Sequence, residues 1–191
     1  MKIVVGVTGA SGSIYAFRLL KYLVKSKDVE KIFLVASHVG ERVFQYEMGF
    51  PISNLGKYDR VKIFDVDDFF APISSGSFKI DGMVVVPCSM STLSSIASGV
   101  NLNLIHRSAE VSLKEGRKLL LVLREMPFNL IHVKNMEKII LSGGAILSAS
   151  PSFYGKPSSI ENLVDTVVIK ILDFLKIENE IRGRWGGDEE G

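Results

Sequence analysis

Residues 2–37, KIVVGVTGASGSIYAFRLLKYLVKSKDVEKIFLVAS, contain one complete unit of the fold. The apolar runs at 2–7 and 31–36 are continuous rather than alternating, as is typical of strands buried on both faces of a sheet. Between them, apolar residues recur at helical spacing over residues 13–25. A strand, a helix and a second strand in this order predict two parallel strands joined by a crossover helix.

The same alternation continues to residue 175. Continuous apolar runs predict further strands at 61–64, 82–86, 118–123 and 145–147. Ser158 and Glu161 have the spacing of a capping box for the last helix, and helices are predicted at 39–48, 92–97, 104–115, 134–141 and 160–175. We therefore expect an α/β fold of three layers, with a doubly wound, Rossmann-like and mostly parallel sheet between helices.

The composition is that of a single globular domain. The chain has 191 residues, 47% of them hydrophobic, and a formal net charge of +2. No linker or repeat divides it, so we expect one domain over residues 1–178 and a tail over 179–191. The nearly neutral charge favours neither nucleic acid nor a membrane surface. The first apolar run is too short for a signal sequence or a membrane span, so we expect a cytoplasmic protein.

Few residues are suited to metal binding. The single cysteine, Cys88, excludes an internal disulfide and a cysteine-built metal site. None of the three histidines, His38, His106 and His132, has the spacing of a metal-binding motif. We therefore expect no metal in this protein.

The loop after the first strand, GVTGASGS at 6–13, is rich in glycine and precedes a helix. In parallel sheets, ligands bind beyond the carboxyl ends of the strands, and a helix N-terminus there attracts phosphate. The loop matches neither GxGxxG nor the phosphate loop that ends in GK[ST]. The second strand ends at Ala36, Ser37 and His38 without the acid that would hold the ribose of NAD. These features favour a mononucleotide, and the alternative is a turn that binds nothing.

Two further strands end in polar residues. Ser89, Ser91 and Thr92 follow the strand at 82–86, where hydroxyls and amides can hold an anionic or carbonyl-rich group. Cys88 is either a nucleophile or a small packing residue, and packing is favoured because no cation or histidine is adjacent. Arg124 and Glu125 follow the strand at 118–123, either as a site or as a surface ion pair.

Other polar and aromatic residues have two possible interpretations. Arg107 and Lys114 stand seven residues apart on one helix face, which suits either a phosphate or a solvated surface. Tyr154 lies in a loop between prolines, and Lys170 is placed either to bind a ligand or to pair with Asp173. Trp185, in the tail, indicates a docking anchor.

Several stretches together resemble the flavin prenyltransferase family of the UbiX type, within the homo-oligomeric flavin-containing Cys decarboxylase-like superfamily. The resemblance runs along the whole chain and is strongest in the PCSM-x-T stretch and in the series of basic residues that ends at REMP. It is carried by VTGASGS at 7–13, SSGSF at 74–78, DGMVVVPCSMSTLSSIASG at 81–99, NLIHRSAEVSLKEGRKLLLVLREMP at 103–127, SPSFY at 150–154, LVDTVVIKILD at 163–173 and RW at 184–185.

The resemblance implies a flavoprotein-type fold and an FMN site. It also implies a transferase that joins the dimethylallyl group of dimethylallyl monophosphate to N5 and C6 of reduced FMN, without a metal. The prenylated FMN would then serve a UbiD-type decarboxylase, in ubiquinone biosynthesis or aromatic-acid breakdown. On matching positions, the FMN would be held by Gly9, Ala10, Ser11, Ser37, Ser89, Met90, Ser91, Thr92 and Arg124.

The resemblance also implies a site for the donor phosphate at subunit interfaces of a large homo-oligomer, often a dodecamer. Glu47 matches a residue contributed by a neighbouring subunit, and Trp185 matches a residue near the active site. Phe78 is an aromatic candidate for stabilising the allyl cation. Position 170 is Lys where the family commonly has Arg, which keeps the charge but loses the bidentate fork. The remaining phosphate contacts are Arg107, Lys114, Arg124, Glu125, Tyr154 and Lys170.

Within this hypothesis, Glu125 transfers a proton, relayed through Ser11 and the phosphate, and Lys114 is among the cations that stabilise the leaving phosphate. One alternative is an FMN-dependent decarboxylase of the peptidyl-cysteine type. The absence of a histidine in residues 71–78 counts against it, because those enzymes use a histidine in this region. A second alternative is a flavin carrier without catalysis, which needs no second phosphate site.

Overall fold

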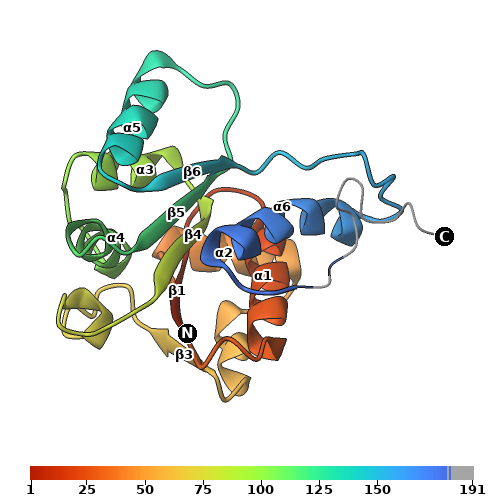
Figure 1. The fold of residues 1–191 in the computed structure, drawn as a ribbon, viewed down its shortest axis with the longest axis horizontal. Helices are drawn as coiled ribbons and strands as arrows, with labels where there is room; N and C mark the ends of the chain where they lie inside the picture. The colour runs from red at the N-terminus through yellow and green to blue at the C-terminus, as the bar shows by residue number, and fades with distance from the viewer. Residues whose placement is uncertain (180, 182–191) are drawn as a thin grey trace.

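A computed structural model describes residues 1–179 and 181. Six parallel strands form one sheet in the order β3-β2-β1-β4-β5-β6 (Figure 1). The strand order confirms the predicted doubly wound sheet, because the chain proceeds from β1 toward one edge and from β4 toward the other. The strands are β1 (Lys2–Val7), β2 (Lys31–Ala36), β3 (Val61–Phe64), β4 (Gly82–Cys88), β5 (Lys118–Leu123) and β6 (Ala145–Ser148).

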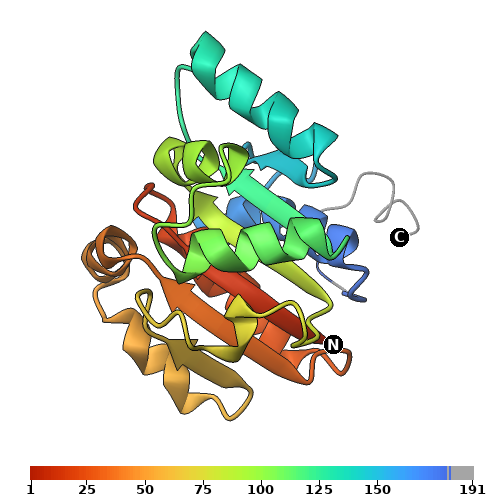
Figure 2. The same cartoon turned by 90° about the vertical axis from the view of Figure 1, so that its left-hand side faces the viewer.

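Helices cover both faces of the sheet. They are α1 (Ser13–Lys25), α2 (His38–Met48), α3 (Met90–Ala97), α4 (Leu104–Lys114), α5 (Leu130–Leu141) and α6 (Ile160–Leu175), with short 3-10 helices at Ile52–Lys57 and Pro72–Ser74. Side chains of β1 alternate between two cores: Val5 packs with α1 and α6, and Val4 packs with α3, α4 and α5. Figure 2 shows α5 at the β6 end of the sheet. This arrangement gives the three layers expected from the sequence.

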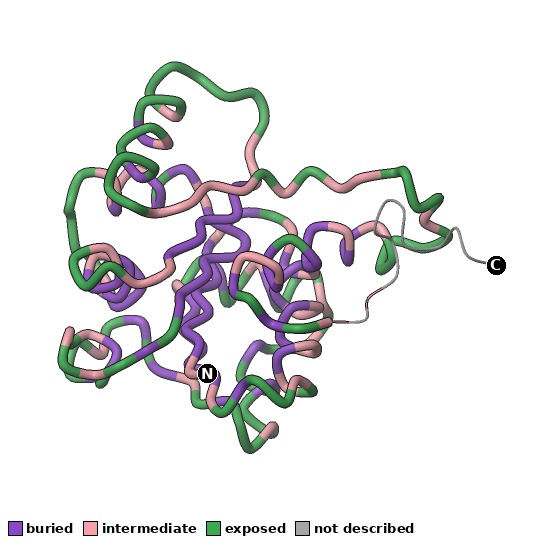
Figure 3. The backbone as a smooth tube through the Cα atoms, viewed as in Figure 1, coloured by how far each residue is buried: buried purple, intermediate pink, exposed green. Residues whose placement is uncertain are grey.

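The central strands are buried throughout, as their continuous apolar runs predict (Figure 3). β4 extends two residues beyond the predicted end, through Pro87 and Cys88. Its pairing with β5 shifts between Val85 and Cys88, because Pro87 has no N–H to donate to the ladder. The proline therefore makes the strand irregular without ending it.

Four helices begin earlier or are capped differently than predicted. α2 begins one residue early, at His38. α3 begins at Met90, directly after the cap Ser89, and α5 begins at Leu130, after the cap Asn129. A capping box usually has Glu or Gln at the third helical position, but in α5 His132 takes that place. The usual sequence pattern therefore does not predict the first turn of this helix. The predicted cap of α6 is wrong, since Ser159 and not Ser158 accepts the bond from the amide of Asn162.

The end of the described chain returns to the body of the protein. Ile181 packs against the same core as α1 and α6. Of the predicted tail, only Asn179 and Ile181 fall within the described residues, and Trp185 lies outside them. No helix in residues 1–179 is long and apolar enough to cross a membrane.

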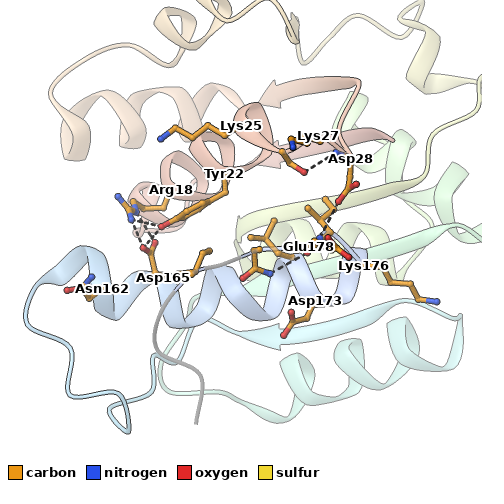
Figure 4. Close-up of a pocket in the computed structure, with 15 residues that line it drawn as sticks. Arg18, Tyr22, Lys25, Lys27, Asp28, Asn162, Asp165, Asp173, Lys176 and Glu178 are labelled. Carbon is orange, nitrogen blue, oxygen red and sulfur yellow. Dashed lines mark hydrogen bonds and ion pairs between the residues drawn. The ribbon is translucent and has the colours of Figure 1, made fainter. Parts of the chain in front are cut away.

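A buried ion pair joins α1 to α6 (Figure 4). Two nitrogens of the Arg18 guanidinium, Nε and Nη2, donate hydrogen bonds to the carboxylate of Asp165, and the bond from Nε is 2.8 Å long. The hydroxyl of Tyr22 donates to the same carboxylate at 2.6 Å. Because the Asp165 side chain is only 4% exposed, its charge depends on these partners for compensation.

We therefore expect Arg18→Met to lower the free energy of unfolding by about 3–5 kcal/mol, since it removes the cation and leaves a buried carboxylate. Urea unfolding followed by circular dichroism at one protein concentration measures the change. Arg42→Met, on the exposed face of α2, is the matched control and should change stability by about 0.5 kcal/mol or less. Equal stability of the two variants would contradict a structural role for the pair.

Candidate functional site

Three loops meet where the strand order reverses, at the carboxyl ends of β1, β4 and β5. The amide of Ser37 donates to the carbonyl of Val7 at 2.9 Å, which places the start of α2 beside the first loop. The Nε of Arg124 donates to the carbonyl of Ser11 at 3.1 Å, so the β5 loop reaches the glycine-rich loop after β1. The predicted FMN residues therefore lie together at this edge, which we call the carboxyl edge.

Thr8 holds the loop after β1 to the turn after β4, and no motif in the sequence singled it out. Its hydroxyl donates to the carbonyl of Pro87 at 2.8 Å and accepts from the amide of Ser89 at 2.8 Å. Thr8 is 2% exposed, so both bonds are shielded from water. The only sequence signal for this role is a hydroxyl residue directly after a buried strand.

Two glycines allow the first loop to adopt its path. Gly12 has φ +108°, a left-handed conformation that residues with a side chain rarely adopt, and it caps α1. A Cβ on Gly9 would lie 2.5 Å from Cγ1 of Val39, so any larger residue would push α2 away. The glycines predicted from the pattern thus serve backbone conformation and close approach.

The anion at the N-terminus of α1 is the carboxylate of this chain's own Glu47. The amides of Gly12 and Ser13 donate to its Oε2 at 3.0 and 2.7 Å. Within one chain, Glu47 thus contacts the loop after β1, and its predicted contribution to the site of a neighbouring subunit stays a prediction. Partial burial raises the pKa of Glu47, but bonds from Ser11, Ser13 and Gly12 outweigh it, so the pKa lies below its ordinary value.

The hydroxyls after β4 divide into two roles. Ser89 caps α3: its oxygen accepts from the amide of Thr92 at 3.3 Å, and its hydroxyl donates to Oγ1 of Thr92 at 3.2 Å. Thr92 and Met90 are buried, whereas Ser91 is exposed at the start of the helix. Of the residues predicted to cradle FMN here, Ser91 offers an exposed hydroxyl, and Ser89 and Thr92 maintain the turn.

Cys88 is a packing residue. It is fully buried in the core beneath α3, and burial raises the pKa of its thiol well above the ordinary range. A thiol in this state is not ionised near neutral pH and is a poor nucleophile. Within residues 1–179 and 181, no three His, Cys, Asp or Glu side chains gather in a way that could hold a metal ion.

Arg124 and Glu125 make separate contacts instead of the ion pair considered as an alternative. Arg124 bonds the carbonyl of Ser11, and Oε1 of Glu125 accepts from the amide of Met126 at 3.0 Å. Both side chains are partly exposed at the carboxyl edge. A cation and a carboxylate are thus presented to the same edge without neutralising each other.

The predicted phosphate contacts on α4 lie away from this edge. The Nε of Arg107 donates to the carbonyl of Ser74 at 3.0 Å, and a Cβ on Gly76 would lie 2.9 Å from Nζ of Lys114. Both cations therefore face the segment at 74–76, as their spacing on one helix face predicts. Lys114 precedes β5 and Arg124 follows it, so about 20 Å of strand separates the two within one chain.

Phe78 lies with the α4 group. Its ring centroid is 5.5 Å from that of Phe33, and the ammonium of Lys2, at the beginning of β1, lies 5.8 Å from it. This position is toward the amino ends of the strands. Phe78, Arg107 and Lys114 form a second group, which we call the α4 group, apart from the carboxyl edge.

The remaining predicted residues are on the C-terminal third of the chain. Tyr154 is exposed in the segment 149–159, which leaves β6 and runs out from the sheet before α6 begins (Figure 1). Lys170 is exposed in the second half of α6. Trp185 is outside the described residues.

A doubly wound parallel sheet with exposed hydroxyls and a cation at its switch point is typical of proteins that bind a nucleotide there. The family model described as Flavoprotein matches residues 1–172. The curated flavin prenyltransferase UbiX of Methanocaldococcus jannaschii is 44% identical over 97% of this chain and 99% of its own length. This chain belongs to the flavin prenyltransferase family.

Solved structures agree with this assignment. A UbiX structure described as a complex with FMN and dimethylallyl pyrophosphate has a TM-score of 0.92 and 41% identity, covering 97% of each chain. A structure from Escherichia coli O157:H7, described as a dodecameric FMN-dependent UbiX-like decarboxylase, has a TM-score of 0.93 and 38% identity. It covers 98% of this chain and 100% of its own.

The bonds of Glu47 to the α1 amides predict a pH dependence of stability. A depressed folded-state pKa means that Glu47 stabilises the protein fully above its ordinary pKa of 4.5 and loses this effect as pH falls through the depressed value. The difference in melting temperature between wild type and Glu47→Gln should therefore be constant near neutrality and shrink below pH 4.5. Thermal melts from about pH 3 to about pH 7, a range that spans the ordinary pKa of a carboxylate, measure this difference in melting temperature. A difference that grows toward acid would contradict the bonds described.

Proposed function

We propose that this protein transfers the dimethylallyl group of dimethylallyl monophosphate to reduced FMN, forming bonds to N5 and then C6 of the flavin and releasing phosphate. The observation that carries the proposal is the gathering of Ser11, Arg124 and Glu125 at the carboxyl edge. The curated relatives named flavin prenyltransferase support the reaction, and the UbiX structure described with FMN and dimethylallyl pyrophosphate supports the substrates.

The carboxyl edge fits a flavin mononucleotide. The bonds of Glu47 to Gly12 and Ser13 demonstrate that amides of the first loop attract an anion. With that helix end occupied by Glu47, the flavin phosphate requires other donors in the same loops. The chain offers Gly9, Ala10, Ser11, Ser37, Ser91 and Arg124, with Ser89, Met90 and Thr92 shaping the turn.

The reduced flavin supplies the nucleophilic N5, and the chain supplies charge and shielding. When the bond between the allyl carbon and the phosphate oxygen breaks, the phosphate carries the electron pair away, and cations lower the energy of that separation. Arg124 at the carboxyl edge is one such cation. Aromatic faces of Phe78, Tyr154 and Trp185 are suited to stabilise the allyl cation.

We assign Glu125 to proton transfer. Its carboxylate lies at the end of β5 beside Arg124, and Arg124 contacts the loop of Ser11. Ser11 is exposed and Glu47 accepts a hydrogen bond from its side chain, so a proton can pass between this loop and a bound phosphate. The bond from Arg124 joins it to the loop of Ser11, and Glu125 adjoins Arg124 in the chain, so we place all three beside the reacting atoms.

The site is composed of two copies of the chain. Lys114 and Phe78 lie about one strand length from Arg124 and Glu125 in the same chain, too far to contact one substrate phosphate together. A second copy that presents its α4 group to the carboxyl edge of the first removes this separation. The side chains of Tyr154 and Lys170 are exposed, and we propose that they also reach a site shared between copies.

Such a composite site requires a homo-oligomer, and we propose a dodecamer like the relative from Escherichia coli. Lysine at position 170 retains charge but not the fork that arginine offers a phosphate. We therefore expect the monophosphate to bind somewhat more weakly than in relatives with arginine. The product would be passed to a separate decarboxylase of the UbiD type that uses prenylated flavin.

The proposed reaction predicts a specific product. Anaerobic incubation with reduced FMN and dimethylallyl monophosphate should yield a flavin with the added mass of one dimethylallyl group and a changed absorbance spectrum. Glu125→Gln should slow its formation by about 100-fold or more, because an amide cannot accept the proton. Glu41→Gln, exposed on α2, is the matched control and should retain the wild-type rate.

A normal rate in Glu125→Gln would show that Glu125 does not transfer the proton. An unchanged flavin with the wild-type protein would favour the carrier alternative, and release of carbon dioxide from a peptidyl cysteine with oxidised FMN would favour the decarboxylase. Comparison of the monophosphate with the pyrophosphate under the same conditions identifies the preferred donor.

The composite site predicts complementation between inactive variants. Glu125→Gln damages the carboxyl edge and Lys114→Ala damages the α4 group, so mixed assemblies should contain sites with neither lesion. Random mixing of two copies per site gives about one quarter intact sites. Co-expression with two affinity tags, isolation of mixed assemblies and the prenylation assay should therefore show recovery to about this fraction.

Co-expression of Glu125→Gln with Ser11→Ala is the control. Both residues belong to the carboxyl edge, so every site retains one lesion and no recovery is expected. If the Lys114→Ala mixture remains as inactive as either parent, the site is not shared between copies in the way proposed.

A further inference from the structure

The outward face of α5 carries a symmetric pattern of exposed side chains. Leu130, Lys134, Glu137 and Leu141 are separated by four, three and four residues, so they form one line along the helix. Leu130 is 68% exposed and Leu141 is 80% exposed, and both charged residues between them are exposed. We call these four residues the α5 stripe.

The stripe lies opposite the side of α5 that packs on the protein. Only Asn135 and Ile139 are buried within this helix, and Ile139 belongs to the core beneath α3 and α4. Figure 3 shows α5 as largely exposed, at the edge of the molecule beyond β6. Large apolar side chains this exposed at both ends of one helix face are uncommon on a surface that contacts only water.

The α5 stripe is complementary to a second copy of itself that runs in the opposite direction. Its centre lies between Asn135 and Met136, with Leu130 and Leu141 equally distant from that point, and with Lys134 and Glu137 equally distant from it. Two such helices laid antiparallel across a two-fold axis therefore match leucine to leucine and lysine to glutamate, twice each. Isologous interfaces have this property, because each residue of a pair meets its counterpart in both directions.

We propose that the α5 stripe is a two-fold interface with a second copy of this chain. Leu130 of one copy packs on Leu141 of the other, and Lys134 of one pairs with Glu137 of the other. A second copy is favoured over an unrelated partner because the charges and apolar ends of the stripe complement themselves, whereas an unrelated partner requires no such symmetry.

This interface is distinct from the one that completes the site. The proposed function requires a heterologous contact, in which the α4 group of one copy meets the carboxyl edge of another, and repetition of that contact closes a ring. A two-fold contact joins such rings into a larger closed assembly. The inference uses the proposed composite site only for this relation, since the stripe itself rests on the exposure and spacing of α5.

The apolar surface also continues toward the site. Phe128 precedes α5, is exposed, and its ring lies 6.5 Å from that of His132 in the first turn. Met126, in the loop of Glu125, is exposed as well. A second copy seated on α5 would thus lie close to the loop that presents Arg124 and Glu125.

Charge reversal tests the pairing directly. Lys134→Glu places like charges opposite each other at both ends of the two-fold contact, and so does Glu137→Lys. Each variant should weaken this contact by about tenfold or more and shift the assembly to a smaller mass in sedimentation velocity. The double variant Lys134→Glu/Glu137→Lys restores both cross pairs and should recover the wild-type mass.

Lys25→Glu, an exposed charge reversal near the end of α1, is the matched control and should leave the mass unchanged. Circular dichroism checks that each variant is folded. If the charge variants aggregate, Leu130→Asn combined with Leu141→Asn tests the same contact and should also reduce the mass. The proposal is overturned if the single charge-reversal variants or the leucine variant keep the wild-type mass. It is also overturned if the double charge variant stays dissociated, or if the wild-type protein is monomeric.

Mass and activity separate this inference from the proposed function. If the wild-type protein prenylates FMN but the α5 variants keep their assembly, only the interface is wrong. If the α5 variants dissociate and reassemble as expected while no protein prenylates FMN, only the function is wrong.

Discussion

The hydroxyl of Thr8 connects the two strand ends between which the sheet reverses its order. It bonds the carbonyl of Pro87 and the amide of Ser89, so the ends of β1 and β4 are held at a fixed separation. The glycine-rich loop and the serine-rich turn begin at these two points. The loop that begins at this junction also accepts the bond from Arg124, at the carbonyl of Ser11.

The length of the strands divides the predicted residues into two groups. Residues after β1, β4 and β5 meet at one edge, whereas Lys114 precedes β5 and Phe78 lies near Lys2 at the start of β1, toward the opposite edge. A parallel sheet cannot bring both edges to one ligand, because about 20 Å of β5 intervenes. A site that uses both groups must therefore be shared, and this geometric limit links the chemistry to assembly.

Most of the fold and the carboxyl edge could be predicted from the sequence. Continuous apolar runs identified six strands, and all six predicted helices end within one residue of their expected last residue, although α3 and α5 begin earlier than predicted. The misses were local: Ser159 replaced Ser158 as a cap, and α5 began at Leu130 because His132 completes its cap. Such choices depend on side-chain geometry at a helix end, which spacing alone does not encode.

The sequence by itself determined the fold class and the family, and it predicts which residues carry the chemistry, because hydrophobic periodicity and motif spacing are local along the chain. Only the tertiary structure decided which of these residues act together. It brought Glu47 to the amides of Gly12 and Ser13, gave Thr8 its linking role, and separated Lys114 from Arg124. These relations depend on distances between segments far apart in the chain, which are defined by the packing of strands and helices around two buried cores.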